Sequence, residues 1–331
     1  MPKYLKWLGL SIIAFVILAT GAVAEAQQPK KIWRIGFLSS VSPDPYAHLY
    51  TAFLQGLRDL GYIDGQNVML KPRWAEGNTE RLPQLATELV DLKVDLMVST
   101  GGTVTALAAK ASTTSIPIVF TAGGDLVKVG LISSLARPGG NLTGLSLLTT
   151  ELNVKRLELL KETFPKIRRV GVLGNPANPN YRIQLNETQA AAKQLGLQVQ
   201  VLEMRNPNEI ESVFSKVSDK SVGALLVLSD PTLNAHRERI ADVATKSRLP
   251  AIFEFKEFVE AGGLMSYGTN IIAVYRRVAI YVDKIFRGAK PSELPVEQPT
   301  NFEFLINLNA AKQIGVTIPP NVLARADRVI K

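Results

Sequence analysis

Short apolar runs alternate with amphipathic helical segments from residue 32 onward, and this alternation is the feature that most limits the fold. Between the runs, apolar residues recur at three- and four-residue spacing, which is typical of one buried helix face. Strands separated by helices pair in parallel and are covered by those helices. The predicted strands are residues 32–38, 94–99, 116–121, 170–173, 199–202, 224–228, 250–253 and 264–267. The predicted helices are residues 48–60, 82–92, 154–163, 183–195 and 237–246.

The two halves of the chain repeat one plan. Three strand segments of the first half match three of the second half, in the same order and at similar spacing: Arg34-Ile-Gly-Phe-Leu with Arg169-Val-Gly-Val-Leu, Val94-Asp-Leu-Met-Val with Gly223-Ala-Leu-Leu-Val, and Ile116-Pro-Ile-Val-Phe with Leu249-Pro-Ala-Ile-Phe. A turn-rich stretch, residues 137–144, lies between the halves. The sequence therefore predicts an α/β fold with two doubly wound parallel-sheet lobes joined by a hinge.

The amino terminus has the order of a secretory signal. Lys3 and Lys6 precede an uncharged, mostly apolar run over residues 8–20, and small residues then occupy the −3 and −1 positions of two possible cleavage sites, after Ala24 and after Ala26. We expect a signal peptide over residues 1–26, with cleavage after Ala26 and an exported mature chain. The alternative is an uncleaved membrane anchor, because the apolar stretch counted over residues 7–24 approaches the ~20 residues that span a bilayer.

Composition argues against several classes of function. The chain of 331 residues has no cysteine, which excludes thiol catalysis and cysteine metal sites. Its net charge of +9 comes from scattered lysines and arginines, so we expect a solvated basic surface and no nucleic-acid partner. His48 and His236 lack a second ligand at helical spacing, and no nucleophile or phosphate-binding motif is present. We expect neither a metal site, nor a cofactor, nor an enzymatic activity.

Candidate ligand contacts follow the predicted strands of the first half, because open α/β sheets bind ligands at the carboxyl ends of their strands. The loop Thr100-Gly-Gly-Thr103 leads into a helix, where unpaired backbone N–H groups and the helix dipole favour a ligand carboxylate. The alternative is an ordinary turn with Thr103 as the helix N-cap. The candidates of this half are Ser39, Ser40, Thr100, Gly101, Thr103, Thr121 and Ala122, each with capping or turn formation as its alternative role.

The corresponding positions of the second half are polar as well. Asp230 can begin the helix after Pro231, whereas Glu254 ends an apolar run, and a carboxylate there requires a cationic partner. We therefore prefer Glu254 over Asp230 as the partner of a ligand ammonium group. Tyr267 can stack on a ligand, or it can have a role in the hinge or in the core. The candidates of this half are Asn175, Ser229, Asp230, Glu254 and Tyr267.

Several stretches together resemble one family of ABC transporter substrate-binding proteins, the group whose better-known members bind aromatic amino acids. They are Lys155-Arg-Leu-Glu-Leu-Leu-Lys161, Ala261-Gly-Gly-Leu-Met-Ser-Tyr-Gly268, Leu294-Pro-Val-Glu-Gln-Pro299 and Phe304-Leu-Ile-Asn307. The resemblance extends from Arg34 to Asp327. One departure is Leu126, which stands where the family commonly has proline.

The resemblance implies a periplasmic-binding-protein type I fold. We expect a first lobe of residues 30–146 with about 268–298, and a second of residues 147–267 with about 299–331. The implied function is a periplasmic receptor that closes on an amino acid or similar small carboxylate and delivers it to an inner-membrane ABC permease with its ATPase. We expect a monomer. Open alternatives are a sugar- or purine-like solute, and a sensor that docks on a membrane signalling protein.

Overall fold

The computed structural model describes residues 31–217 and 222–331, and Trp33–Lys331 forms one compact unit. The expected signal peptide, like the alternative anchor, lies outside the described residues. Within the described ranges, no helix combines the length and the apolar character that crossing a bilayer requires.

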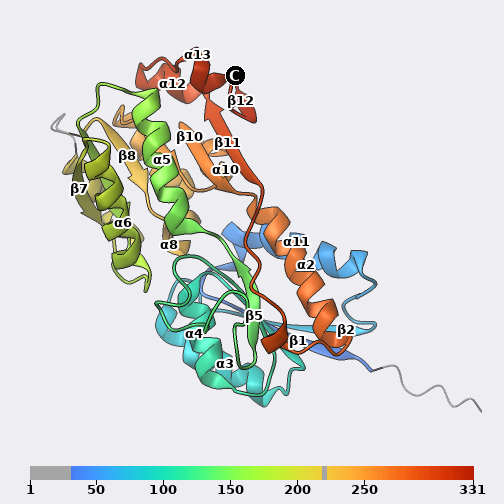
Figure 1. The fold of residues 1–331 in the computed structure, drawn as a ribbon. Coiled ribbons are helices and arrows are strands. Elements are labelled where there is room, and N and C mark those ends of the chain that lie inside the picture. Colours follow the sequence, from blue (N-terminus) through green and yellow to red (C-terminus); the bar gives the residue numbers. More distant parts are fainter. Residues whose placement is uncertain (1–30, 218–221) are drawn as a thin grey trace, which may run out of the picture. The chain divides into compact units, whose positions relative to one another are not determined.

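The first sheet has five parallel strands in the order β2-β1-β3-β4-β5. Helices cover both of its faces, with α2 and α11 in one apolar cluster and α3 and α4 in the other (Figure 1). The strands are β1 (Trp33–Ser39), β2 (Val68–Trp74), β3 (Leu96–Thr100), β4 (Ile118–Ala122) and β5 (Leu142–Ser146). The helices are α2 (Pro43–Asp59), α3 (Leu82–Asp91), α4 (Thr103–Ser112) and α11 (Ile271–Phe286).

The second sheet has seven strands in the order β12-β11-β10-β9-β8-β6-β7, parallel except for the antiparallel pair β10–β11. One face packs against α5, α6, α12 and α13, and the other against α7, α9 and α10. The strands are β6 (Arg169–Gly174), β7 (Gln198–Glu203), β8 (Ala224–Val227), β9 (Ala251–Phe253), β10 (Met265–Thr269), β11 (Phe302–Asn307) and β12 (Arg328–Ile330). The helices are α5 (Thr149–Thr163), α6 (Tyr181–Gln194), α7 (Ile210–Ser215), α8 (Pro231–Ala235), α9 (Arg237–Lys246), α10 (Lys256–Glu260), α12 (Leu308–Ile314) and α13 (Pro320–Leu323).

Burial on both faces explains why the central strands are continuous apolar runs. In β4, Val119 belongs to the cluster beneath α2 and α11, while Phe120 belongs to the cluster beneath α3 and α4. A strand covered by helices on both sides has no solvent face, so it shows no polar alternation. The two doubly covered sheets confirm the predicted fold class.

Four strands were not predicted from apolar runs. Strand β2 lies at the edge of the first sheet, where only its first residue is buried and Pro72 is tolerated. Strand β5 is buried throughout, but its Thr, Gly and Ser residues obscure its apolar character. Strands β11 and β12 end the second sheet on one side. Helix α2 also begins earlier than predicted, because Ser42 precedes it and Pro43 is suited to its first turn.

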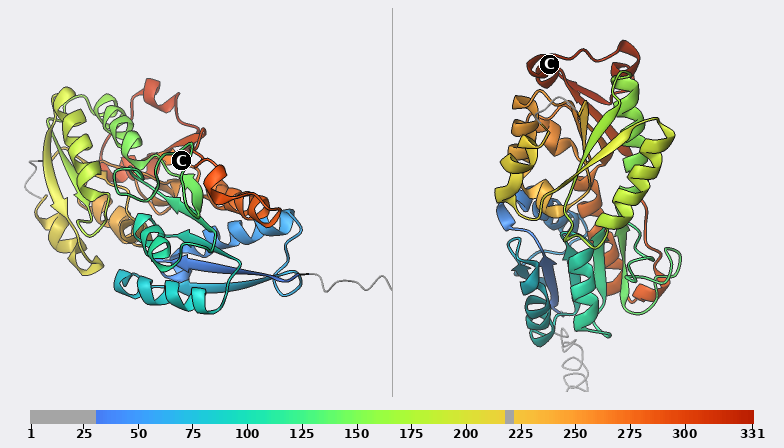
Figure 2. Two further views of the ribbon diagram at one scale, coloured as in Figure 1. Left: turned by 60° about the horizontal axis from the view of Figure 1, so that its bottom comes forward. Right: turned by 90° about the vertical axis from the view of Figure 1, so that its left-hand side faces the viewer.

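The chain passes between the two sheets at three places, as the ribbon views show (Figure 2). The passages lie between β5 and α5, between β10 and α11, and before β11. In the first, Leu148 adopts the left-handed conformation with φ of 52°. The Oγ1 of Thr269 donates to the carbonyl oxygen of Leu147 at 3.4 Å, which ties the first two passages together.

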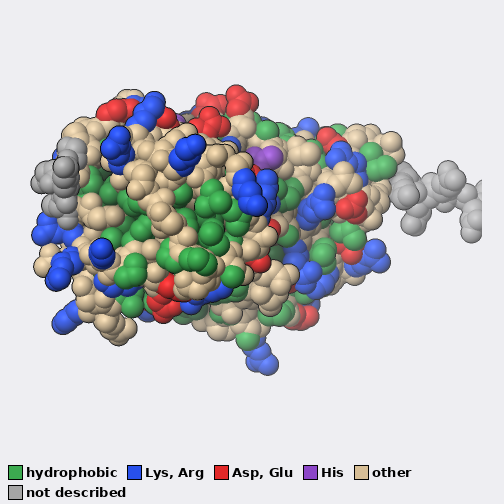
Figure 3. Space-filling model, turned by 90° about the horizontal axis from the view of Figure 1, so that it is seen from above, with side chains coloured by type: hydrophobic (Ala, Val, Ile, Leu, Met, Phe, Trp, Pro, Cys, Tyr) green, Lys and Arg blue, Asp and Glu red, His purple; other side chains and the backbone are tan. Residues whose placement is uncertain are grey.

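Charged side chains are scattered over the face shown in Figure 3, where lysines and arginines stand among polar and apolar groups. Most of the ion pairs are between exposed side chains, for example Lys246 with Asp242 and Lys290 with Glu293. Such pairs contribute little to stability because solvent screens them.

We expect Gly144→Ala to destabilise the fold by about 3 kcal/mol or more, because the new Cβ would lie 2.1 Å from the carbonyl oxygen of Phe120 in the neighbouring strand. Gly61→Ala is the matched control. Its φ of +84° is unfavourable to alanine, but no atom lies within 4 Å of the new Cβ, so we expect a loss of about 1 kcal/mol. Thermal unfolding of both variants measures the difference. Equal losses would contradict the close packing of β4 and β5.

Candidate functional site

The carboxyl ends of the strands bring the predicted site residues together. Strands β1, β3 and β4 lead into Ser40, Gly101 and Thr121, and strands β6, β8 and β9 lead into the polar residues of the second lobe. Most of these side chains are buried, as a closed cleft requires. We define the cleft by two neighbouring cavities that share lining residues.

The larger cavity, here called the main cavity, has an empty volume of about 510 Å³ including space open to solvent. Five of the residues predicted from the sequence line it: Gly101, Thr103, Thr121, Ser229 and Asp230.

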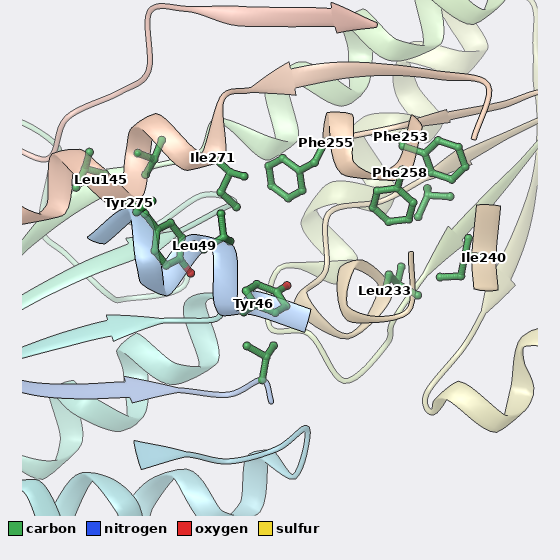
Figure 4. Packing of buried hydrophobic residues seen from close by; sticks show 14 of the residues in the cluster. Tyr46, Leu49, Leu145, Leu233, Ile240, Phe253, Phe255, Phe258, Ile271 and Tyr275 are labelled. Atoms are coloured by element: carbon green, nitrogen blue, oxygen red, sulfur yellow. The ribbon is translucent and has the colours of Figure 1, made fainter. Parts of the chain in front are cut away.

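Part of the lining of the main cavity is aromatic or aliphatic. Tyr46, Phe255, Ile271 and Tyr275 come from α2, the loop after β9 and α11, and they lie near one another in the close view (Figure 4). Leu147, in the first passage between the sheets, also lines the main cavity and contributes a further aliphatic group. Rings and aliphatic groups in this arrangement can bury an apolar ligand side chain.

The smaller cavity has an empty volume of about 340 Å³, and its lining includes several polar side chains. It shares Thr103 and Asp230 with the main cavity and adds the predicted residues Ser40 and Asn175. The polar groups here are already engaged, since Ser40 donates to the carbonyl oxygen of Gly101 at 2.6 Å and Asn175 Nδ2 donates to Asp230.

The remaining predicted residues lie outside the linings of both cavities: Ser39, Thr100, Ala122, Glu254 and Tyr267. All but Tyr267 are buried, with Glu254 only 4% exposed. Tyr267 packs between Phe302 and Phe304, with ring centroids 6.1 and 6.2 Å away. The structure thus puts Glu254 behind the cavity wall and Asp230 in the wall.

The loop before α4 has the form that its two glycines predict. Gly101 and Gly102 have φ of +79° and +97°, and Gly102 is the N-cap without a side-chain hydrogen bond. The interpretation of Thr103 as the N-cap is therefore wrong. Its Oγ1 instead donates to the carbonyl oxygen of Gly123 at 2.8 Å. The first turn of α4 leaves backbone N–H groups free of intrahelical partners, which suits an anionic group.

Asp230 is the one charged side chain among the residues that line the main cavity. It caps α8 by accepting from the backbone N–H of Leu233 at 3.0 Å, as the sequence suggested. Its carboxylate also accepts from the Nδ2 of Asn178 at 3.0 Å. Burial raises the pKa of Asp230, while these hydrogen bonds act in the opposite direction. A negative group in a buried wall favours a cationic group of a ligand.

Hydrogen bonds join the two lobes across the cleft. Asn180 Nδ2, at the start of α6, donates to Thr103 Oγ1 at 2.8 Å and to the carbonyl oxygen of Gly123 at 2.9 Å. The Tyr46 hydroxyl donates to the carbonyl oxygen of Pro231 at 3.1 Å and accepts from Asn234 Nδ2 at 2.9 Å. The Oδ1 atoms of Asn180 and Asn234 are buried without hydrogen-bond partners. The lobes are thus closed on one another.

Sequence reasoning missed a group of lining residues that come from helices or from segments before them. Most of them lie several residues after a strand, so a search limited to strand ends passes over them. Asn180 immediately precedes α6, where asparagine is a common N-cap, and that signal alone does not distinguish a ligand contact. The missed residues with aromatic, aliphatic or amide side chains on these segments include Tyr46, Asn178, Asn180, Gln184, Asn234, Phe255, Ile271 and Tyr275.

Relatives of this chain are found by sequence and by structure. A tyrosine-binding protein of Clostridioides difficile is 28% identical over 288 residues, which is 87% of this chain and 82% of that protein. The crystal structure of a conserved domain protein from Vibrio cholerae superposes with a TM-score of 0.85 at 29% identity, covering 90% of this chain and all of that one.

Two further structures differ in their ligand state. An ABC domain from Streptococcus pneumoniae in complex with L-Trp has a TM-score of 0.81 at 27% identity, covering 89% of this chain and 100% of that chain. The ligand-free, open structure of a substrate-binding protein with adhesive properties from Clostridium difficile has a TM-score of 0.67 at 27% identity. The match covers 91% of this chain and 99% of that chain.

The sequence profile of the family described as "ABC transporter substrate binding protein" matches residues 34–330. This match covers nearly the whole of the described chain and includes both sheets. The resemblance noted from the sequence is thereby confirmed, and the chain belongs to the ABC transporter substrate-binding protein family.

Proposed function

We propose that this protein is the solute receptor of an ABC importer and that its ligand is an aromatic amino acid. The observation that carries the proposal is the composition of the main cavity, where aromatic and aliphatic side chains surround a space whose single charged lining group is Asp230. Apolar walls suit an aromatic side chain, and a lone carboxylate suits an ammonium group. The tyrosine-binding relative and the L-Trp complex support the same ligand class.

The ligand carboxylate would lie against the first turn of α4. The cavity lining contains no lysine or arginine among the described residues, so the negative charge must be balanced by backbone N–H groups and the helix dipole. Gly101 and Thr103 border this position, and Thr121 and Ser229 complete the polar wall. Ser40 and Asn175 line the smaller cavity. The other predicted residues would support the wall of the main cavity from behind.

The proposal includes a place and partners for the receptor. Export, followed by removal of residues 1–26, would bring it to the periplasm, where it would deliver its ligand to a membrane permease with its ATPase. It would bind reversibly, as a monomer, and catalyse no reaction. The proposed lobes are residues 30–146 with about 268–298, and residues 147–267 with about 299–331. The packing of α11 on α2 and the pairing of β11 with β10 support this division.

Lobe closure would accompany binding. The chain is more similar to the L-Trp complex, with a TM-score of 0.81, than to the ligand-free open structure, with 0.67. The hydrogen bonds of Asn180 and Tyr46 across the cleft form only when the lobes meet. A ligand that contacts both lobes shifts the population toward this closed state.

Isothermal titration calorimetry with L-Trp, L-Tyr and L-Phe tests the ligand class. We expect at least one to bind, and its analogue without the ammonium group to bind at least tenfold more weakly, about 1.4 kcal/mol. Asp230→Asn should weaken amino-acid binding similarly while preserving the cap of α8, since asparagine is an equally good N-cap. Asp242→Asn, on an exposed position of α9, is the control and should bind normally. Binding of a sugar or purine, with none of the three amino acids bound, would refute the ligand class.

Asn180→Ala tests the role of closure. The variant loses two hydrogen bonds between the lobes, which together contribute about 1–3 kcal/mol, so affinity for the ligand should fall by roughly 5- to 150-fold. Small-angle X-ray scattering of the ligand-bound variant should show a larger open fraction than the wild type. Asn208→Ala, at an exposed position, serves as the control. Unchanged affinity in Asn180→Ala would mean that these bonds do not stabilise the closed state.

A further inference from the structure

A network of buried polar side chains lies behind the cavity wall in the second lobe. Its centre is Arg156 of α5, which is fully buried and is the largest of the fully buried side chains. Arg156 Nε donates to the carbonyl oxygen of Tyr267 at 2.7 Å, and its Nη1 donates to Asn153 Oδ1. A buried guanidinium group is costly unless its donors are satisfied and its charge is balanced. Because burying this charged side chain is costly, we expect Arg156 to have a role beyond filling space.

The network continues from Arg156 to the wall of the main cavity. Asn153 Nδ2 donates to Gln184 Oε1 at 3.2 Å. Gln184 then holds the backbone of Ser229 by two hydrogen bonds of 3.1 Å. Gln184 Oε1 accepts from the N–H of Ser229, and Gln184 Nε2 donates to the carbonyl oxygen of Ser229. Gln184 and Ser229 both line the main cavity. The position of this part of the wall is therefore set from behind, by a chain that begins at Arg156.

Glu254 supplies the opposite charge. It is 4% exposed, and the neighbouring Ser229 lowers the pKa of this carboxyl against the effect of burial. Its Oε1 and the Nη2 of Arg156 are both buried and both without a hydrogen-bond partner. Burial lowers the pKa of Arg156 to about 10 and raises that of Glu254 to about 7, and each charge opposes the shift of the other. The two groups therefore belong to one buried polar network, in which Asn153 and Gln184 lead from Arg156 to the backbone of Ser229.

The same network reaches the passage between the sheets. Tyr267, whose carbonyl oxygen Arg156 holds, lies in β10 two residues before the end of that strand, and the chain then enters α11. The next residue, Gly268, lies so close to Glu254 that a Cβ there would be 2.0 Å from the Glu254 carbonyl oxygen. Thr269 then bonds to Leu147 of the neighbouring passage. Arg156 thus reaches the cavity wall through Asn153 and Gln184 and bonds directly to β10, and the backbone of Glu254 lies against Gly268 of the same strand.

We propose that Arg156 and Glu254 are positioning residues for ligand binding: together they hold Ser229 at the cavity wall and β10 at its passage into α11. Neither side chain lines the cavity, so they act through Ser229, Gln184 and Tyr267. Glu254, expected from the sequence to meet the ligand directly, acts in this account from behind the wall. The inference rests on the proposed binding of an aromatic amino acid.

The test is a set of variants, Arg156→Met, Glu254→Gln and the double variant, each measured for thermal unfolding and for affinity to L-Trp and L-Tyr. Arg156→Met should lower both the unfolding temperature and the affinity, because it leaves the Glu254 carboxylate buried without a counter-charge. The double variant should recover most of the unfolding temperature, since no unpaired buried charge remains. The affinity of the double variant for the amino acid should stay at least tenfold below that of the wild type, because the polar network that positions Ser229 and β10 remains broken. Lys155→Met, at the exposed neighbouring position of α5, is the control and should change neither quantity.

Recovery of affinity together with stability in the double variant would overturn the inference and leave the pair a purely structural role. Failure of the wild type to bind either amino acid would instead contradict the proposed ligand class. In that case backbone amide hydrogen exchange of the double variant decides the inference without a ligand. Faster exchange at residues 229 and 267–270 than in the wild type is the expected result, and unchanged exchange there would overturn it.

Discussion

Parallel strands all end at the same edge of a sheet, and this constraint determines where a ligand can bind in this protein. Each sheet is covered by helices on both faces, so its faces are closed to a small molecule, and ligands of such sheets bind at the edge where strands give way to helices. The two sheets present these edges to one cleft, and residues of both lobes line the main cavity there. The apolar cores fix the strands, and the strands in turn fix the positions of Thr103, Thr121, Ser229 and Asp230.

Closure depends on polar groups whose partners lie in the other lobe. Asn180 donates both of its amide hydrogens across the cleft, and Tyr46 connects α2 to Pro231 and Asn234. In an open molecule water can satisfy these groups, so the net gain on closing is small for each bond. A modest gain is what reversible uptake and release require, because a receptor that closes too strongly without ligand cannot discriminate or discharge it.

The sequence was sufficient to predict the fold class and the sheet edge at which the main cavity lies, but only part of the lining of that cavity. Apolar runs revealed the central strands because both of their faces are buried, whereas β2 at a sheet edge and β5 with its small polar residues gave no such signal. Thr103 and Asp230, within three residues of the ends of β3 and β8, were predicted because their position in the chain places them near the strand ends. Tyr46, Asn180 and Tyr275 lie on or just before helices, and whether they reach the cavity depends on the packing of α2, α6 and α11, which a sequence pattern does not specify.

Native mass spectrometry of the freshly purified protein tests the central claim most directly, because a tightly held solute survives gentle purification. The account predicts one retained molecule with the mass of an aromatic amino acid, lost or strongly reduced in Asp230→Asn. A retained sugar or nucleobase, or a solute without an amine, would contradict the proposal that Asp230 pairs with a ligand ammonium group.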